Sequence, residues 1–340
     1  MYYEKLSDNT VKCHLCPHNC TIKEGNRGIC NARKNIDGRL ISLNYGKQTA
    51  YAYDPIEKKP LYHFYPGRDI FSIGSFGCNL HCDFCQNWGI AHGKALSMEI
   101  EDEDILLLGQ SKNSIGIAYT YNEPTISYEY IYHISKLAKE RGLKNVLITN
   151  GFINEEPLMG ILPYIDAMNI DLKSINEDFY KRICKGKLDP VLKTIEIAVR
   201  HTHVEITTLI IEGENSSEEE LESLTSWLGN INREIPFHIS KYFPNYKMQL
   251  PPTSYNALIK AKDIAEKYLD YVYIGNIWGT DNNTYCPNCN TQLINRQGPG
   301  EILDLVNGKC KKCGEKINIT PPCHPEGKPP CHPEAKPKDL

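Results

Sequence analysis

Two features are missing from this 340-residue sequence: a long apolar stretch and a concentration of basic charge. No segment approaches the roughly 18 consecutive apolar residues that span a bilayer, and the opening residues, MYYEKLSDNTVK, lack the apolar core of a signal peptide. Lys and Arg are scattered along the chain and the formal net charge is only -4, so the sequence offers no electrostatic footprint for a nucleic acid. We therefore expect a globular, cytoplasmic protein that has no membrane partner, and the sequence gives no support for a nucleic acid partner.

Disulfide bonds are not expected either, although the chain contains 14 cysteines. A chain with 41% hydrophobic residues can bury a core without covalent staples, and a reducing compartment would not maintain them. Most of the cysteines fall into three local groups, which indicates metal binding. The groups are Cys13, Cys16, Cys20 and Cys30; Cys78, Cys82 and Cys85; and Cys286, Cys289, Cys310 and Cys313.

The region between the second and third groups alternates short β-branched runs with longer amphipathic stretches, which is typical of βα units around a parallel sheet. Helices are predicted at 126–141 and 216–230. The fold class is therefore α/β, and six or seven strands favour a partial (β/α)6-type barrel with its chemistry at the carboxyl ends of the strands. The predicted strands are 70–76, 115–120, 145–149, 167–172, 204–211, 236–240 and 271–275, with two more near 39–43 and 47–53.

The barrel is predicted to occupy residues 70–280, and the flanking segments differ from it. Residues 1–69 form a predicted N-terminal four-cysteine subdomain, and residues 281–319 a zinc-ribbon-like module. Residues 320–340 contain PPCHPEGK followed by PPCHPEAK, a proline-rich tandem repeat with almost nothing to bury, which predicts a disordered tail.

A CxxxCxxC sequence follows the first barrel strand directly, within SIGSFGCNLHCDFCQNWGIAH. Thiolates are the usual ligands of iron–sulfur clusters, and a cubane normally takes four of them, one for each iron. Three cysteines leave one iron open, and an open position on a metal centre is where a substrate or cofactor binds. The spacing also permits a zinc site made of these cysteines and a histidine such as His81 or His92.

The spacing of Cys78, Cys82 and Cys85, with the aromatic Phe84 before the last of them, resembles the signature of the radical S-adenosylmethionine (SAM) superfamily. The resemblance implies a catalytic [4Fe–4S] cluster on the three cysteines, with SAM bound to the open iron through its amino and carboxylate groups. It also implies a reductant such as flavodoxin or ferredoxin. An electron from the cluster would split SAM into methionine and a 5′-deoxyadenosyl radical, which abstracts hydrogen from a substrate.

Further segments match the superfamily at later strand ends. YTYNEPT, residues 119–125, stands where the superfamily has a Gly-Gly-Glu segment, so Glu123 is the candidate for holding the methionine amino group. Tyr121 and Asn122 replace the two glycines, so the backbone near SAM must differ. ITNGF and NIDLKS resemble segments beside SAM in pyruvate formate-lyase activating enzymes. The resemblance thus adds these cofactor-binding candidates: Phe84, Asn122, Asn150, Asp171, Lys173 and His238.

Structural roles remain open for three of these candidates. Asp171 and Lys173 lie two residues apart on one strand, so both side chains face the same side and can enter the barrel lumen or form a plain ion pair. His238 is equally well explained as a core histidine with its hydrogen bonds satisfied.

The two flanking cysteine groups each offer four thiolates. In the C-terminal group, the knuckles CPNC and CKKC predict a zinc ribbon that depends on its metal for stability, with a rubredoxin-like iron site as the alternative. In the N-terminal group, spacing does not decide between structural zinc and an accessory iron–sulfur cluster. Zinc is slightly favoured, because Pro17 and the turn from Gly25 to Gly28 resemble compact loops more than a ferredoxin sequence.

Motif order up to residue 319 resembles the AmmeMemoRadiSam-system radical SAM enzymes, relatives of the pyruvate formate-lyase activating enzymes. The resemblance implies an enzyme, with hydrogen abstraction from a protein or peptide as one hypothesis. Radical modification of RNA or a small molecule is the alternative within the same chemistry. A metal-bound RNA-interacting or scaffold protein is the non-enzymatic alternative, and the near-neutral charge counts against it.

Overall fold

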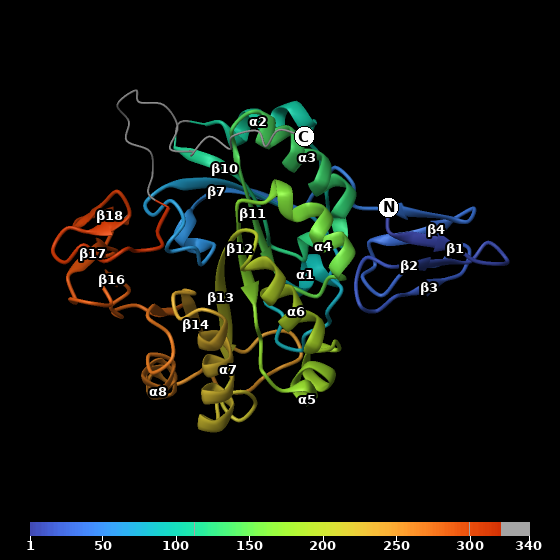
Figure 1. Ribbon diagram of the computed structural model, residues 1–340. Helices are drawn as coiled ribbons and strands as arrows, with labels where there is room; N and C mark the ends of the chain where they lie inside the picture. The colour runs from blue at the N-terminus through green and yellow to red at the C-terminus, as the bar shows by residue number, and fades with distance from the viewer. Residues whose placement is uncertain (112, 299, 321–340) are drawn as a thin grey trace, which may run out of the picture.

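The computed structural model describes residues 1–320 except 112 and 299, so nearly all of the tail predicted to be disordered lies outside the described residues. Its centre is an eight-stranded sheet in the order β15-β14-β13-β12-β11-β10-β8-β7 (Figure 1). The strands are β7 (Ala50–Pro55), β8 (Asp69–Gly74), β10 (Ser114–Tyr119), β11 (Lys144–Thr149), β12 (Ala167–Asp171), β13 (His203–Ile210), β14 (Phe237–Lys241) and β15 (Val272–Gly275).

The strands from β8 to β15 are parallel and lie in sequence order, so each connection moves one position along the sheet. Such crossovers have one hand and carry the carboxyl end of every strand to the same edge. Because β7 and β15 are not paired with each other, the barrel stays open, as predicted. The antiparallel pairing of β7 with β8 extends the sheet across the predicted domain boundary at residue 69.

Helices and short helical turns connect the strands. Helix α3 follows the predicted pattern, because one face carries buried residues such as Ile131 and Ile134. Helix α7 begins after Ser217, whose side chain accepts a hydrogen bond from the backbone N–H of Glu220. The helices are α1 (Trp88–Ala91), α2 (Asp102–Gly109), α3 (Tyr128–Glu140), α4 (Glu155–Ile161), α5 (Glu177–Phe179), α6 (Asp189–Ala198), α7 (Glu218–Ile231) and α8 (Tyr255–Ala265). The short turns are η1 (Ile56–Lys58), η2 (Pro124–Ser127), η3 (Leu162–Tyr164) and η4 (Tyr180–Cys184).

The N-terminal region forms small antiparallel sheets beside the barrel (Figure 1). A partly buried ion pair connects it to α3: the guanidinium of Arg33 donates to both carboxylate oxygens of Glu129, at 3.0 and 2.6 Å. A bidentate pair of this kind holds position as well as charge. The strands are β1 (Tyr3–Lys5), β2 (Val11–Cys13), β3 (Thr21–Ile22), β4 (Arg33–Ile36), β5 (Arg39–Ser42) and β6 (Lys47–Gln48), the last paired with β9 (Met98–Glu99).

The C-terminal module, residues 284–310, lies across the molecule from the N-terminal sheets in Figure 1. It has a hydrophobic cluster of its own, which includes Leu293 and Ile294 and packs with Tyr271 and Tyr273 at the barrel's last strand. Its strands are β16 (Thr284–Tyr285), β17 (Gln292–Asn295), β18 (Glu301–Ile302), β19 (Leu305–Val306) and β20 (Lys309–Cys310).

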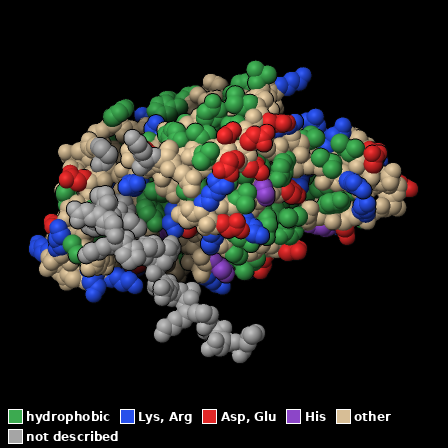
Figure 2. Space-filling model, turned by 90° about the horizontal axis from the view of Figure 1, so that it is seen from above, with side chains coloured by type: hydrophobic (Ala, Val, Ile, Leu, Met, Phe, Trp, Pro, Cys, Tyr) green, Lys and Arg blue, Asp and Glu red, His purple; other side chains and the backbone are tan. Residues whose placement is uncertain are grey.

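The surface agrees with the scattered charge of the sequence. Figure 2 shows Lys and Arg side chains interspersed with Asp and Glu over one face of the molecule. Among the described residues, no helix is long and apolar enough to cross a membrane.

Candidate active site

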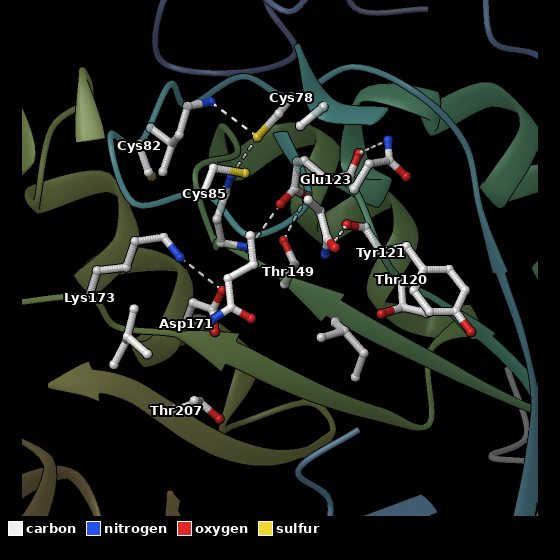
Figure 3. A pocket seen from close by; sticks show the side chains of 18 of the residues that line it. Cys78, Cys82, Cys85, Thr120, Tyr121, Glu123, Thr149, Asp171, Lys173 and Thr207 are labelled. Carbon is white, nitrogen blue, oxygen red and sulfur yellow. Dashed lines mark hydrogen bonds and ion pairs between the residues drawn. The ribbon is translucent and has the colours of Figure 1, made fainter. Parts of the chain in front are cut away.

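A pocket with about 1320 Å³ of empty space lies at the carboxyl ends of the parallel strands. Successive strands each contribute to its wall, which is the expected consequence of a common carboxyl edge. Figure 3 shows the three central cysteines on one side of this pocket, with Glu123, Asp171 and Lys173 around it. Its lining includes Cys78, Cys82, Phe84, Cys85, His92, Thr120, Tyr121, Asn122, Glu123, Thr149, Asn150, Asp171, Lys173, Thr207 and Ser240.

The cysteine loop, residues 75–87, follows β8 and turns its three thiols to the pocket. The sulfur of Cys78 accepts hydrogen bonds from the backbone N–H of Leu80 at 3.4 Å and from Nδ2 of Asn150 at 3.7 Å. Backbone hydrogen bonds from His81 and Asp83 to the carbonyl oxygens of Cys184 and Ile183 fasten the loop to η4. Loop and strand ends are thus held in one arrangement.

The three thiols are spaced too widely for one metal ion. Among the described residues, the C-terminal cysteines are the only group of three or more metal-binding side chains whose ligand atoms all lie within 4.8 Å of one another. In a cubane each thiolate binds a different iron, so the cysteine sulfurs lie farther apart than those around a single ion. The structure therefore does not assemble the alternative zinc site with His81 or His92.

Cys184 is a neighbour of this loop that sequence spacing did not reveal. It is buried in η4 and its thiol interacts with that of Cys82. This interaction lowers the pKa of Cys82, whereas burial would raise it. Cys184 does not line the pocket, so three thiols face the open space.

Glu123 is a buried hydrogen-bond acceptor that joins three segments. Its Oε1 accepts from the backbone N–H of Thr125 at 3.0 Å and from the hydroxyls of Thr125 and Thr149, both at 2.7 Å. Its Oε2 accepts from the backbone N–H of Asn150 at 2.8 Å. Burial raises the pKa of Glu123 in spite of these hydrogen bonds, which act in the opposite direction. One carboxylate thus connects the ends of β10 and β11 beneath the pocket.

Asp171 and Lys173 form the pair expected from their spacing, with Oδ2 and Nζ 2.9 Å apart. The ammonium also lies 5.8 Å from the ring centre of Phe84. Burial by itself lowers the pKa of Lys173, but the negative charge of Asp171 and the thiol of Cys82 outweigh it, so the net pKa lies above its ordinary value. Lys173 therefore places a fixed positive charge beside the thiols.

Comparison with known proteins identifies the family. A profile of the Radical SAM superfamily matches residues 72–226. The chain is 30% identical over 187 residues to a pyruvate formate-lyase-activating enzyme of Clostridium pasteurianum, which covers 49% of this chain and 75% of that enzyme. It is 46% identical over 330 residues to an uncharacterized protein of Methanocaldococcus jannaschii, covering 94% of this chain and 98% of the other.

The chain belongs to the radical SAM superfamily. It is an enzyme of this type and is related to activating enzymes. In fold, it is similar to the solved structure of Streptococcus suis SuiB bound to S-adenosylmethionine, with a TM-score of 0.50 at 14% identity over 66% of this chain and 53% of that one.

Tyr121, at the rim of the pocket, has a backbone conformation that favours glycine. Tyr121 has φ +68°, in the left-handed region that costs a non-glycine residue roughly 1–2 kcal/mol. Its hydroxyl donates to Asp54 at 2.9 Å, and the ammonium of Lys59 lies 4.8 Å from its ring centre. These contacts hold the strained residue. Asn122 accepts a hydrogen bond from the backbone N–H of Ser75 at 2.9 Å and so ties this segment to the cysteine loop.

His238 is not brought to the pocket. Its Nε2 lies 2.6 Å from Glu205 Oε2, and Glu205 also contacts His203 at 2.9 Å. Burial alone would raise the pKa of Glu205, but these hydrogen bonds outweigh it and hold the pKa well below its usual range. His238 lies two residues, or about 6.6 Å, before Ser240, the residue of β14 that lines the pocket. The contacts of His238 are those of a core histidine, and the pocket lining gives no support for its predicted cofactor role.

His92 is a lining residue for which the sequence suggested only a zinc alternative. Both of its ring nitrogens are buried without a hydrogen-bond partner among the described residues. Burial lowers its pKa to about 4, so the ring is neutral at neutral pH.

The C-terminal cysteines converge on a single point, as the two knuckles predict. The sulfurs of Cys286 and Cys313 are 3.5 Å apart, and those of Cys289 and Cys310 are 3.7 Å apart. Four sulfurs placed tetrahedrally at a Zn–S distance of roughly 2.3 Å lie about 3.8 Å from one another. A hydrogen bond from Thr291 lowers the pKa of Cys289 to about 6 and thereby favours its thiolate. The group fits one tetrahedral metal ion.

Proposed function

We propose that this enzyme binds a [4Fe–4S] cluster through Cys78, Cys82 and Cys85 and reductively cleaves SAM to generate a radical that abstracts hydrogen from a protein or peptide. The observation that carries the proposal is the set of three thiols, spaced too widely for one ion, facing one open pocket. The family relationship supports SAM as the second ligand.

The donors around the thiols fit such a cluster. Hydrogen bonds to the sulfur ligands and nearby charge set the reduction potential of an iron–sulfur centre. Leu80 and Asn150 already donate to Cys78, and Lys173 places positive charge beside Cys82. When bound, the cluster supplies the electron that splits SAM into methionine and a 5′-deoxyadenosyl radical.

The chain's own residues would hold and orient SAM. Glu123 Oε2 accepts one hydrogen bond among the described contacts and keeps acceptor capacity for an ammonium group such as that of methionine. Phe84, Asn122, Asn150, Asp171 and Lys173 line the same pocket, and we propose that they contact SAM. The residues that close the loop against η4 keep the thiols in place while the ligand binds.

The rim of the pocket favours a protein or peptide as substrate. Phe243 is 43% exposed and Trp278 is 98% exposed. With Asn276, which also lines the main pocket, they border an adjoining hollow. Exposed aromatic residues are common where protein surfaces meet, whereas an RNA substrate would call for a concentration of basic side chains, and Lys and Arg are scattered along this sequence. Flavodoxin or ferredoxin in the cytoplasm would supply the electron.

The first experiment measures SAM cleavage. Protein reconstituted anaerobically with iron and sulfide is mixed with SAM and dithionite, and 5′-deoxyadenosine is quantified by chromatography. The wild type should form it, and Cys82→Ala should not exceed the background without protein. Cys184→Ala is the matched control, because this buried neighbouring thiol lies outside the pocket and its loss should leave product formation. No product from the wild type, or equal product from Cys82→Ala, would refute the proposal.

The second experiment identifies the substrate class. Peptides with deuterium at the glycine Cα are incubated with the active enzyme, and mass spectrometry measures deuterium in 5′-deoxyadenosine. Transfer from a peptide is the expected result. Transfer from a deuterated RNA or metabolite pool, with none from any peptide, would exclude a protein or peptide substrate.

A further inference from the structure

The N-terminal cysteines surround a second cavity, which lies apart from the main pocket. About 310 Å³ of empty space is lined by Cys13, Cys16, Cys20 and Cys30 together with apolar side chains. Cys13 and Cys30 are buried, and the other two are partly buried. Four thiols that face one cavity are suited to bind a metal centre, and their spacing bears on which one.

The spacing of these four thiols differs from that of the C-terminal group. In the C-terminal group, all four sulfurs lie within 4.8 Å of one another, as a single ion requires. Among the described residues no other group meets this criterion, so no three of the N-terminal thiols do. They nevertheless face one cavity. Thiolates held this far apart suit a core of several atoms that binds each of them, whereas a lone zinc ion would contact only some of them.

A buried cation with an unused donor points at the same place. Arg33 lines the cavity and is only 2% exposed. Its two terminal nitrogens donate to Glu129, but its Nε has no hydrogen-bond partner within the part of the chain that the structure describes. A buried unpaired N–H is costly, and sulfide or thiolate sulfur of an anionic cluster would accept it.

The site also touches the cysteine loop directly. A Cβ on Gly77, whose φ is +90°, would lie 2.5 Å from the carbonyl oxygen of Cys30, so the two backbones meet just before Cys78. Nε2 of His18 donates to the carbonyl oxygen of Asn79 at 2.7 Å. The residues on both sides of Cys78 are therefore in contact with the N-terminal site.

We infer that Cys13, Cys16, Cys20 and Cys30 bind a second iron–sulfur cluster, which lies against the loop of the first. This replaces the slight sequence preference for zinc at this site. The assignment of the first cluster to Cys78, Cys82 and Cys85 rests on the proposed function, whereas the assignment of the second rests on the cavity, the thiol spacing and Arg33.

Metal and sulfide analysis of the variant Cys78→Ala/Cys82→Ala/Cys85→Ala tests this inference with the N-terminal residues unchanged. After anaerobic reconstitution, the variant should retain about four iron and four sulfide per chain, against about eight of each in the wild type. Its Mössbauer spectrum should be that of a cubane. A variant with no iron and two zinc per chain would overturn the inference.

Two further variants separate the possible failures. Adding Cys16→Ser and Cys20→Ser to the triple variant should remove the remaining iron, whereas adding Cys286→Ser and Cys289→Ser, the matched control in the C-terminal four-cysteine group, should remove only the single C-terminal metal. If iron survives Cys16→Ser/Cys20→Ser, these thiols are not its ligands and the inference is wrong. If wild type and triple variant contain equal iron, the first cluster fails and the proposed function with it, while the second cluster stands.

Discussion

Replacing Glu123 by glutamine tests whether this carboxylate holds the pocket together. The substitution keeps the shape of the side chain but exchanges one acceptor oxygen for a donor NH2 group. In the better orientation, the NH2 group faces the backbone N–H of Asn150, and the amide oxygen keeps the three donors from Thr125 and Thr149. One hydrogen bond is then lost, a buried N–H is left unpaired, and three hydrogen bonds lose their charge.

The magnitude follows from these four contacts. A hydrogen bond to a charged group contributes about 1.5–3 kcal/mol, a neutral one about 1 kcal/mol, and an unpaired buried donor costs about 1–3 kcal/mol. Removing a buried charge offsets part of the loss, because burial raises the pKa of Glu123. We expect Glu123→Gln to lower the free energy of unfolding by about 3–5 kcal/mol.

Anaerobic urea unfolding followed by far-ultraviolet circular dichroism measures this change from the shift in midpoint at a common slope. Thr125→Val removes only the hydroxyl donor to the same carboxylate and should cost about 1.5–2 kcal/mol, while Thr125→Ser keeps the donor and should cost less than about 1 kcal/mol. If Glu123→Gln is within about 1 kcal/mol of the wild type, or if Thr125→Ser is as harmful as Thr125→Val, the reasoning about this acceptor is wrong.

Three further predictions concern other parts of the molecule. Burial lowers the pKa of His63 from 6.5 to about 3, so only the unfolded chain protonates this ring as the pH falls to 5. The free energy of unfolding, measured by urea titrations at each pH, should therefore drop by about 2 kcal/mol from pH 7 to pH 5, and this drop should be smaller in His63→Asn. Cys289→Ser should abolish hydrogen-exchange protection in the C-terminal module but not in the central sheet. Unchanged exchange in the C-terminal module would contradict a stabilising metal. Gly116→Ala should lower the free energy of unfolding by about 3 kcal/mol or more, because its Cβ would lie 2.0 Å from the carbonyl oxygen of Lys144. Gly213→Ala, also at positive φ but with no atom within 4 Å of its Cβ, should lower it by only about 1 kcal/mol. Equal losses in thermal unfolding would refute the steric argument.

The barrel could be predicted because its signals are local. Alternating buried runs and amphipathic stretches placed all seven parallel strands within one to two residues of their observed bounds. The pocket followed from the same reasoning, since parallel strands in sequence order share a carboxyl edge. The segment of the edge strand β7 was predicted as a strand, but its hydrophobic pattern does not show which strand it pairs with. Its pairing with β8 in the central sheet is therefore seen only in the structure.

The candidate site was only partly predictable. Glu123, Asn150, Asp171 and Lys173 could be proposed because each stands at or just after a strand end, in a segment that resembles the family. His238 also lies on a predicted strand, but its ring is hydrogen-bonded to the buried carboxylate of Glu205 on β13. Nothing in the sequence near either residue predicts that contact.

The sequence by itself determined the strands, the three cysteine groups and the placement of the central group after the first barrel strand, because these depend on residue type and short spacing. Only the tertiary structure decided how far apart the thiols of each group lie, that Cys184 adjoins Cys82, and that Arg33 faces the N-terminal cavity with an unused donor. Those properties depend on distances between segments remote in the chain, and such distances are set by packing rather than by local pattern.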